Sequence, residues 1–341
     1  MATDAERLEG LDILKFVSII SVIITHYSFS ISDRRLFLFP FYINMAVPVF
    51  MVLSGYCNAL SLKKKGSVYP LDVITKKYVL DRLIKIVIPF FLIFLLEVVC
   101  FKLYKNYSVI TIVTWFFQGG HGPGSYYFPI LVQFIFLFPY IYYLMNYFKE
   151  KGLFYAFLVN IIYEIVVRFY NIPEELYRLL IFRYFFLIAS GCFFAIGLKI
   201  PLKKSILMIV IGGAWIVFTQ YFNYSPVVFR YWTETNLFSA LYIIPIVSFI
   251  IEFLIKYPIK HSIKYRFFSI LGKKTYYIFL IQMFYYYFLY CTNYYLYDFL
   301  PNKIVILFMN IFICIGGGEI FSLICTPLFK LIRRINKKYN D

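Results

Sequence analysis

Residues 11–31 read LDILKFVSIISVIITHYSFSI, an apolar stretch as long as the roughly 20 residues that an α-helix needs to cross a bilayer. Hydrophobic residues make up 62% of the 341-residue chain. A water-soluble domain of this length does not expose enough polar surface to cover so many apolar side chains. The sequence therefore predicts an all-α, polytopic membrane protein.

Further apolar stretches of similar length follow along the chain. We expect a bundle of about ten transmembrane helices, and no internal repeat or appended soluble domain interrupts it. Residues 1–341 are therefore treated as one domain. The expected spans are 11–31, 40–61, 83–102, 126–146, 152–170, 180–199, 204–222, 236–256, 271–290 and 301–325.

The formal net charge of +17 is distributed unevenly over the connections between these spans. Of the 34 Lys and Arg residues, 24 lie in the N-terminus, the connections on that side and the C-terminal tail, while nine lie in the other connections. The positive-inside rule then predicts both termini in the cytoplasm, for a multi-pass protein of the cell (inner) membrane. A nucleic-acid partner is not expected, because it requires a clustered basic face with base-reading groups.

The six cysteines fall inside the spans or at their ends. None are at C-x-x-C spacing, and no His/Cys cluster forms a zinc pattern. We interpret them as small packing residues and expect no metal.

The first span carries the candidate chemistry. His26 follows Lys15 by eleven residues, close to three helical turns, so the two side chains share a helix face with Asp12. An ionisable imidazole inside a bilayer-length segment is a functional candidate, because placing it there is costly. A neutral imidazole is also a suitable general base. The alternatives are a core histidine bonded to a neighbouring helix, and a Lys15 that snorkels or pairs with Asp12.

Two later segments are polar enough to contact substrates. Arg82 and Lys85 share a helix face at the cytosolic end of the third span and suit phosphate groups, although composition alone favours a simple positive-inside flank. The loop QGGHGPGSYYFP (118–129) on the outer side permits close backbone approach to a ligand. The candidate acceptor-binding residues are His121, Ser125 and Tyr126 of the loop, Glu164 of the fifth span and Arg183 at the outer start of the sixth span. For Glu164, an i,i+4 pair with Arg168 is the alternative.

Several motifs in order resemble the integral-membrane acyltransferases of the acyltransferase-3 type, which O-acetylate cell-surface polysaccharides. The resemblance runs over nearly the whole chain. Its motifs are LDILK (11–15) followed by His26, VPVFMVLSGY (47–56), DRLIKIVIP (81–89), FRYFFLIASGCFFAIG (182–197) and LGKKTYYIFLIQ (271–282). The chain departs from the family pattern at Lys15 and Lys85, where arginine is usual, and at Gln282, where histidine is usual.

The resemblance implies an O-acetyltransferase with acetyl-CoA as co-substrate and a polysaccharide or lipid-linked glycan as acceptor, working among membrane lipids. It assigns catalysis to His26 with Lys15 and Asp12, and acyl-CoA binding to Arg82, Lys85, Ser54 and Tyr56. His26 would remove the hydroxyl proton or be acylated transiently itself. The alternatives are a polysaccharide exporter or flippase, or a glycan polymerase. We find no paired broken helices in two halves of the chain, which transporters often show.

Overall fold

The computed structural model describes residues 4–66, 68–104, 108–224, 226–229, 231–257, 263–292 and 302–338, and in these ranges it contains helices and no strand. The helices are α1 (Asp4–Thr25), α2 (Ile31–Leu36), α3 (Phe39–Tyr42), α4 (Ala46–Lys65), α5 (Pro70–Val73), α6 (Lys76–Tyr104), α7 (Val109–Phe117), α8 (Tyr127–Phe148), α9 (Glu150–Phe169), α10 (Glu174–Tyr177), η1 (Ile181–Tyr184), α11 (Phe185–Ala195), α12 (Leu202–Gln220), η2 (Thr233–Thr235), α13 (Leu237–Lys256), α14 (Ile263–Lys273), α15 (Thr275–Thr292) and α16 (Lys303–Lys338).

Each predicted span overlaps at least one helix, and the all-α, multi-pass class is confirmed. Among the described residues, seven segments are long and apolar enough to cross a membrane, centred on α4, α6, α8, α9, α12, α13 and α16. The helices α1, α11 and α15 are not among the seven, and α11 belongs to a shorter apolar helix. The count of ten crossings therefore stays a prediction.

The first predicted span is longer than its helix. α1 ends at Thr25, and the chain turns before α2. Ser30 caps α2 by accepting a hydrogen bond from the Asp33 amide at 3.0 Å, so a new helix begins at the last residue of the expected span. His26 consequently follows α1 instead of lying within it.

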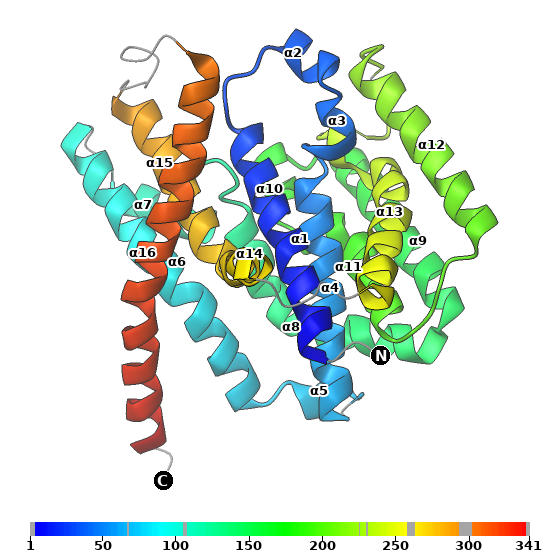
Figure 1. Cartoon of the computed structure of the whole chain (residues 1–341), viewed down its shortest axis with the longest axis horizontal. Coiled ribbons are helices and arrows are strands. Elements are labelled where there is room, and N and C mark those ends of the chain that lie inside the picture. Colours follow the sequence, from blue (N-terminus) through cyan, green and yellow to red (C-terminus); the bar gives the residue numbers. More distant parts are fainter. Residues whose placement is uncertain are drawn as a thin grey trace.

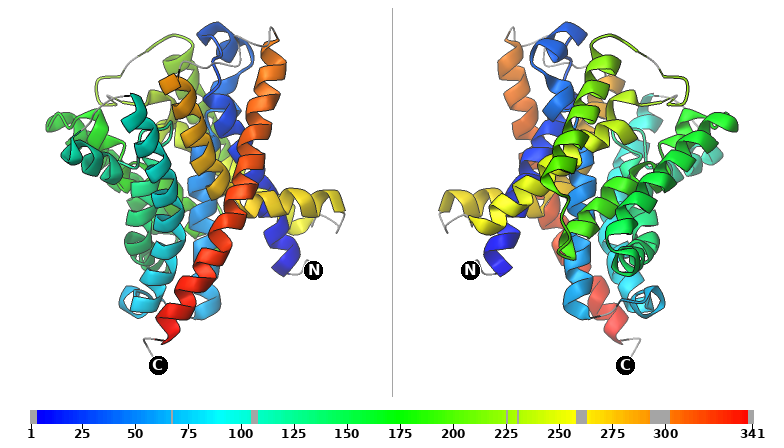
Figure 2. Two further views of the ribbon diagram at one scale, coloured as in Figure 1. Left: turned by 90° about the vertical axis from the view of Figure 1, so that its left-hand side faces the viewer. Right: turned by 90° about the vertical axis from the view of Figure 1, so that its right-hand side faces the viewer.

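The helices form an upright bundle in which α1 begins and α16 ends at the same end (Figure 1). We call this the terminal end; α5 also lies there, and α2 and α3 lie at the opposite end. A shared end agrees with an even number of crossings. α14 runs across the direction of the other long helices and projects from the side of the bundle (Figure 2).

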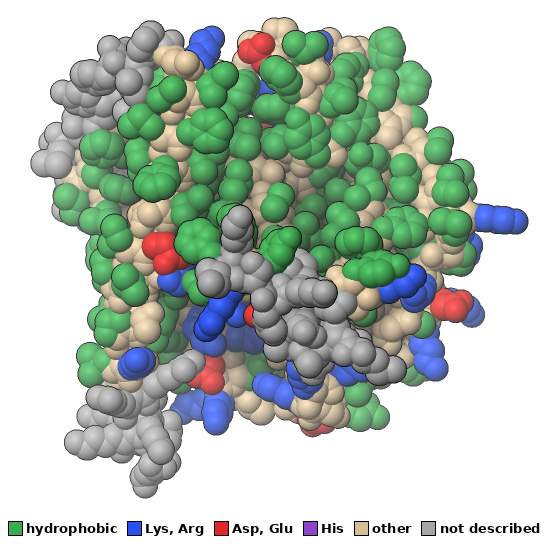
Figure 3. All heavy atoms as spheres, in the orientation of Figure 1, with side chains coloured by type: hydrophobic (Ala, Val, Ile, Leu, Met, Phe, Trp, Pro, Cys, Tyr) green, Lys and Arg blue, Asp and Glu red, His purple; other side chains and the backbone are tan. Residues whose placement is uncertain are grey.

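Charged and hydrophobic side chains on the surface are distributed unevenly along the axis of the bundle. On the face drawn in Figure 3, most of the visible Lys and Arg side chains gather in the lower part, toward the terminal end, and hydrophobic side chains cover the upper part. This distribution agrees with the predicted basic cytoplasmic side. That the terminal end faces the cytoplasm stays a prediction.

The core depends on a close contact between α4 and α11. A Cβ atom added to Gly55 would lie 2.1 Å from the Ile188 carbonyl oxygen, and one added to Gly191 would lie 1.9 Å from that of Val52. The two glycines therefore face each other's helix and allow the backbones to touch. Around this contact and beside it, buried apolar residues form two large clusters, one centred on α4, α8, α11 and α13 and the other on α1, α6, α15 and α16.

Cys192, Cys314 and Cys325 are buried in these clusters, as expected of packing residues, whereas the side chain of Cys291 lies outside the described residues.

Candidate active site

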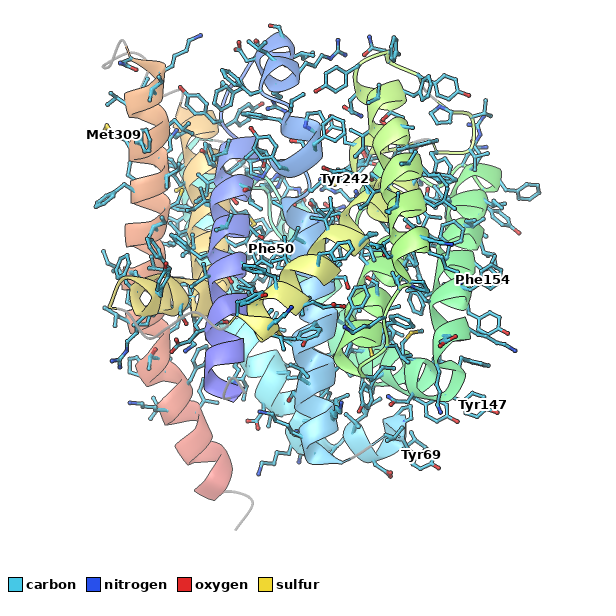
Figure 4. All side chains as sticks on the ribbon, turned by 45° about the vertical axis from the view of Figure 1, so that its right-hand side comes forward. Phe50, Tyr69, Tyr147, Phe154, Tyr242 and Met309 are labelled. Carbon is cyan, nitrogen blue, oxygen red and sulfur yellow. The ribbon has the colours of Figure 1, made fainter. Side chains whose placement is uncertain are left out.

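A cavity of about 870 Å³ lies between the two core clusters. Its lining includes two lysines, Lys85 of α6 and Lys273 at the end of α14, and also Arg34 of α2 and Trp232. Its middle is mainly apolar and includes Phe50, which points into the interior of the bundle, in contrast to the outward-facing Phe154 (Figure 4). Of the helices that contribute to this lining, α2 lies at the end of the bundle opposite the terminal end, and α14 lies about midway along the bundle (Figure 1).

His26 lines this cavity at the point where the chain leaves α1. Its ring centroid lies 6.1 Å from that of Tyr286 on α15, and its amide donates to the Ile23 carbonyl at 3.3 Å. The ring lies past the last residue of α1 and is enclosed by side chains. Burial and, to a lesser extent, the nearby charge of Arg34 lower the pKa of His26 to about 4. The imidazole is therefore neutral at pH 7 and able to accept a proton.

A second cavity of about 460 Å³ also contains His26. It shares His26 with the larger cavity and lies against α15 and α16. The described residues lining it are His26, Ser28, His121, Pro123, Tyr286, Tyr287, Leu289, Tyr290, Ile306 and Asn310. The structure therefore brings His26 and His121, which are far apart in the sequence, to one cavity.

Lys15 and Asp12 form an ion pair at 3.0 Å, one of the two alternatives that the sequence left open. The second Asp12 oxygen lies 3.9 Å from Lys273 Nζ of α14. The Asp12 carboxylate is thus shared by two lysines and joins α1 to α14. Of these three residues, Lys273 is the one that lines the large cavity. A catalytic role for Lys15 and Asp12 stays a prediction.

The four predicted acyl-CoA residues are not gathered at one place. Lys85 lines the large cavity. Arg82, one turn away, donates to Asn58 Oδ1 at 2.5 Å and stacks 4.5 Å above the Tyr78 ring. The Ser54 hydroxyl contacts the Tyr127 phenol, and Tyr127 lines the large cavity. Tyr56 instead lines a separate cavity of about 430 Å³.

The candidate residues of the predicted loop 118–129 are likewise not gathered at one place. His121 lines the second cavity, and Tyr126 lines the large one, where its ring meets Trp232 edge-on at 5.0 Å. Ser125, in the same loop, is buried, with 2% of its surface exposed. Burial and, to a lesser extent, the charge of Arg178 lower the pKa of His121 to about 4, so this ring is also neutral at pH 7.

Glu164 and Arg183 lie behind the large cavity instead of lining it. Glu164 accepts a hydrogen bond from the Tyr177 hydroxyl at 2.9 Å. The Arg183 guanidinium lies 4.1 Å from the Trp232 ring centroid and donates to Thr235 Oγ1 at 2.7 Å. Trp232 and Thr235 both line the cavity. Arg183 therefore holds part of the wall in place through a cation–π contact and a hydrogen bond.

Glu97 is a polar residue of the site that the sequence motifs did not indicate. It lies on α6, its side chain is fully buried, and its Oε2 atom accepts the His121 amide at 3.2 Å. Gly120 has a φ of +88°, and a Cβ atom there would lie 2.6 Å from the same oxygen. Glu97 thus fixes the loop that supplies His121, Gly124 and Tyr126 to the two cavities. A carboxylate within LIFLLEVVC was the available signal, since ionisable residues inside a bilayer are functional candidates.

Comparison with known proteins gives a family assignment. A family model described as an acyltransferase domain, of the acyltransferase-3 type, matches residues 8–335. No curated protein and no solved structure matches the chain. Among the described residues, no group of three or more His, Cys, Asp or Glu side chains is placed to hold a metal ion. Because the match spans nearly the full length, the chain belongs to the acyltransferase-3 family of membrane acyltransferases.

Proposed function

We propose that this membrane acyltransferase transfers an acetyl group from cytosolic acetyl-CoA to a hydroxyl of a polysaccharide or lipid-linked glycan at the outer side of the cell membrane. One observation supports the proposal: His26 lines the same cavity as Lys85 and Lys273. A thioester that enters between these lysines has a continuous space leading to a neutral imidazole.

The donor end combines charge with an apolar passage. Lys85 and Lys273 supply cationic groups for the phosphates of the nucleotide, and Arg82 lies one helical turn from Lys85. Beyond the lysines the wall includes Ile86, Val47 and Phe50. A pantetheine arm is thin and uncharged, so such a wall suits it, whereas the phosphates remain at the basic end.

The acceptor end combines aromatic and polar groups. Trp232 and Tyr126 present ring surfaces that suit the apolar face of a sugar. Arg34, Glu234 and Asn44 add hydrogen-bonding groups, and Asn44 donates to Glu234 at 2.9 Å. This end of the cavity lies near α2, opposite the terminal end.

His26 supplies the acid–base step. The imidazole removes the proton from the sugar hydroxyl as its oxygen attacks the thioester carbonyl carbon. The new C–O bond forms, the C–S bond breaks, and the leaving thiolate of coenzyme A takes the proton from the imidazolium. An acyl-imidazole route divides the same transfer into two steps, with the imidazole as first acceptor.

The test replaces His26 by glutamine, which keeps a polar side chain of similar size but is not basic. His26→Gln should reduce acetylation of the cell-surface glycan, measured by mass spectrometry, by at least about 100-fold. The purified variant should still show a thermal shift with acetyl-CoA, because the lysines of the donor end are intact. Undiminished acetylation with a folded, expressed His26→Gln protein would reject His26 as the catalyst.

A further inference from the structure

The second cavity has the chemistry of a binding site for uncharged sugars. Tyr286 and Tyr290 contribute aromatic rings, and Asn310, Ser28 and His121 contribute hydrogen-bonding groups. None of its described lining residues is Asp, Glu, Lys or Arg. Aromatic rings beside neutral polar groups match a sugar, which has an apolar face and a rim of hydroxyls.

The cavity is open to a large ligand. Tyr290 is 71% exposed and Ser28 is exposed, so the rim reaches the protein surface. A volume of about 460 Å³ falls within the roughly 300–1,000 Å³ of sites that enclose small organic ligands. The nucleotide of the donor does not suit this place, because its phosphates require cations that the described lining lacks.

His26 lines both this cavity and the large one. A hydroxyl that loses its proton to His26 must lie beside its imidazole ring, which both cavities reach. A glycan strand that passes this ring would occupy both.

We propose that the second cavity is a glycan subsite that binds uncharged sugar residues adjacent to the one being acylated. The acceptor is then an oligosaccharide or polymer, and the acetyl group is placed on internal sugars of the strand. This inference rests on the proposed function, of which it specifies the acceptor.

Two variants test the subsite without changing a residue of the catalytic or donor site. Ser28→Trp fills the rim of the cavity, and Tyr290→Ala removes an exposed ring from it. We expect each to lower acetylation of the native cell-surface glycan about fivefold to tenfold, through loss of sugar–aromatic contact or of space. Hydrolysis of acetyl-CoA by the purified protein should stay within about twofold of the parent, because water needs no subsite. Ser32→Trp, at another exposed serine near the same end, is the matched control and should change neither readout.

The position of the acetyl group provides a second measurement. Fragmentation of the native glycan by mass spectrometry should locate acetyl groups on internal sugars, and acetylation confined to a chain end would overturn the subsite. Full acetylation in both Ser28→Trp and Tyr290→Ala would overturn it too, as would a parallel loss of hydrolysis in both. If acetylation also survives in His26→Gln, the proposed function itself is wrong, so the two failures are distinguishable.

Discussion

At the scale of single residues, Glu97 has an unusual position for a carboxylate. It is fully buried on an apolar helix, where a polar group is tolerated only if hydrogen bonds replace those lost with water. One oxygen accepts the His121 amide, and the other has no hydrogen-bond partner among the described residues. Its contribution is therefore to satisfy the backbone of the 118–126 loop, which would otherwise bury unpaired N–H groups.

Replacing Glu97 tests whether its carboxylate stabilises the 118–126 loop. Glu97→Ala should lower the free energy of unfolding by about 1–3 kcal/mol, because a buried N–H group loses its acceptor. Glu97→Gln keeps an acceptor oxygen and should recover most of the loss in thermal unfolding of the detergent-solubilised protein. The control is Glu252→Ala, which removes a surface ion pair with Lys199 at 3.0 Å and should have little effect. Equal melting temperatures for Glu97→Ala and Glu252→Ala would contradict the loop-anchoring role.

At the scale of helices, the α4–α11 contact determines how the large cavity is shaped on one side. α4 begins with residues that line the cavity, including Val47 and Phe50, and its later turns lie directly on α11 at Gly55 and Gly191. No side chain separates the two backbones there. Any added atom must push α4 away from α11, and the shift would reach the cavity wall.

Adding one methyl group measures how strict this contact is. Gly191→Ala places a Cβ atom 1.9 Å from the Val52 carbonyl oxygen and should destabilise the protein by about 1–3 kcal/mol through overpacking. Gly316→Ala makes the same change on α16, where nothing lies within 4 Å of the new atom. That control should be neutral or slightly stabilising, because alanine favours a helix. The measurement is the thermal midpoint in detergent, and two equal shifts would disprove the close contact.

The helices themselves were largely predictable from the sequence, because bilayer-length apolar runs leave the backbone little alternative to helix. Their ends were less so: residues 26–31 were predicted to belong to the first span, yet α1 ends at Thr25 and Ser30 caps a new helix, α2. The site was predictable only in part. Arg82 and Lys85 lie near each other as expected, because they are neighbours on one helix. The junction of His26 with His121 and Tyr286 depends on how α1, α6 and α15 pack, which no local pattern encodes.

At the scale of the whole molecule, the proposed transfer requires the two ends of the large cavity to face opposite sides of the membrane. Lys85 and Lys273 must face the cytosol, where acetyl-CoA is available, and Arg34 and Trp232 must face outward. The uneven distribution of Lys and Arg predicts this orientation independently of any catalytic argument. Topology and function therefore constrain each other, and a measurement of the first tests both.

Labelling of two single-cysteine variants, one toward each end of the bundle, determines the orientation of the protein in the membrane. Ser32→Cys is an exposed position on α2, and Lys63→Cys is an exposed position near the end of α4. A membrane-impermeant maleimide should label Ser32→Cys in intact cells and Lys63→Cys only after permeabilisation, with the unsubstituted chain as the background for its own cysteines. The reverse pattern would place the basic end of the cavity outside the cell. Acetyl-CoA from the cytosol would then meet Arg34 and Trp232 first, and the assignment of Lys85 and Lys273 to the donor phosphates would fail even if His26 remained essential.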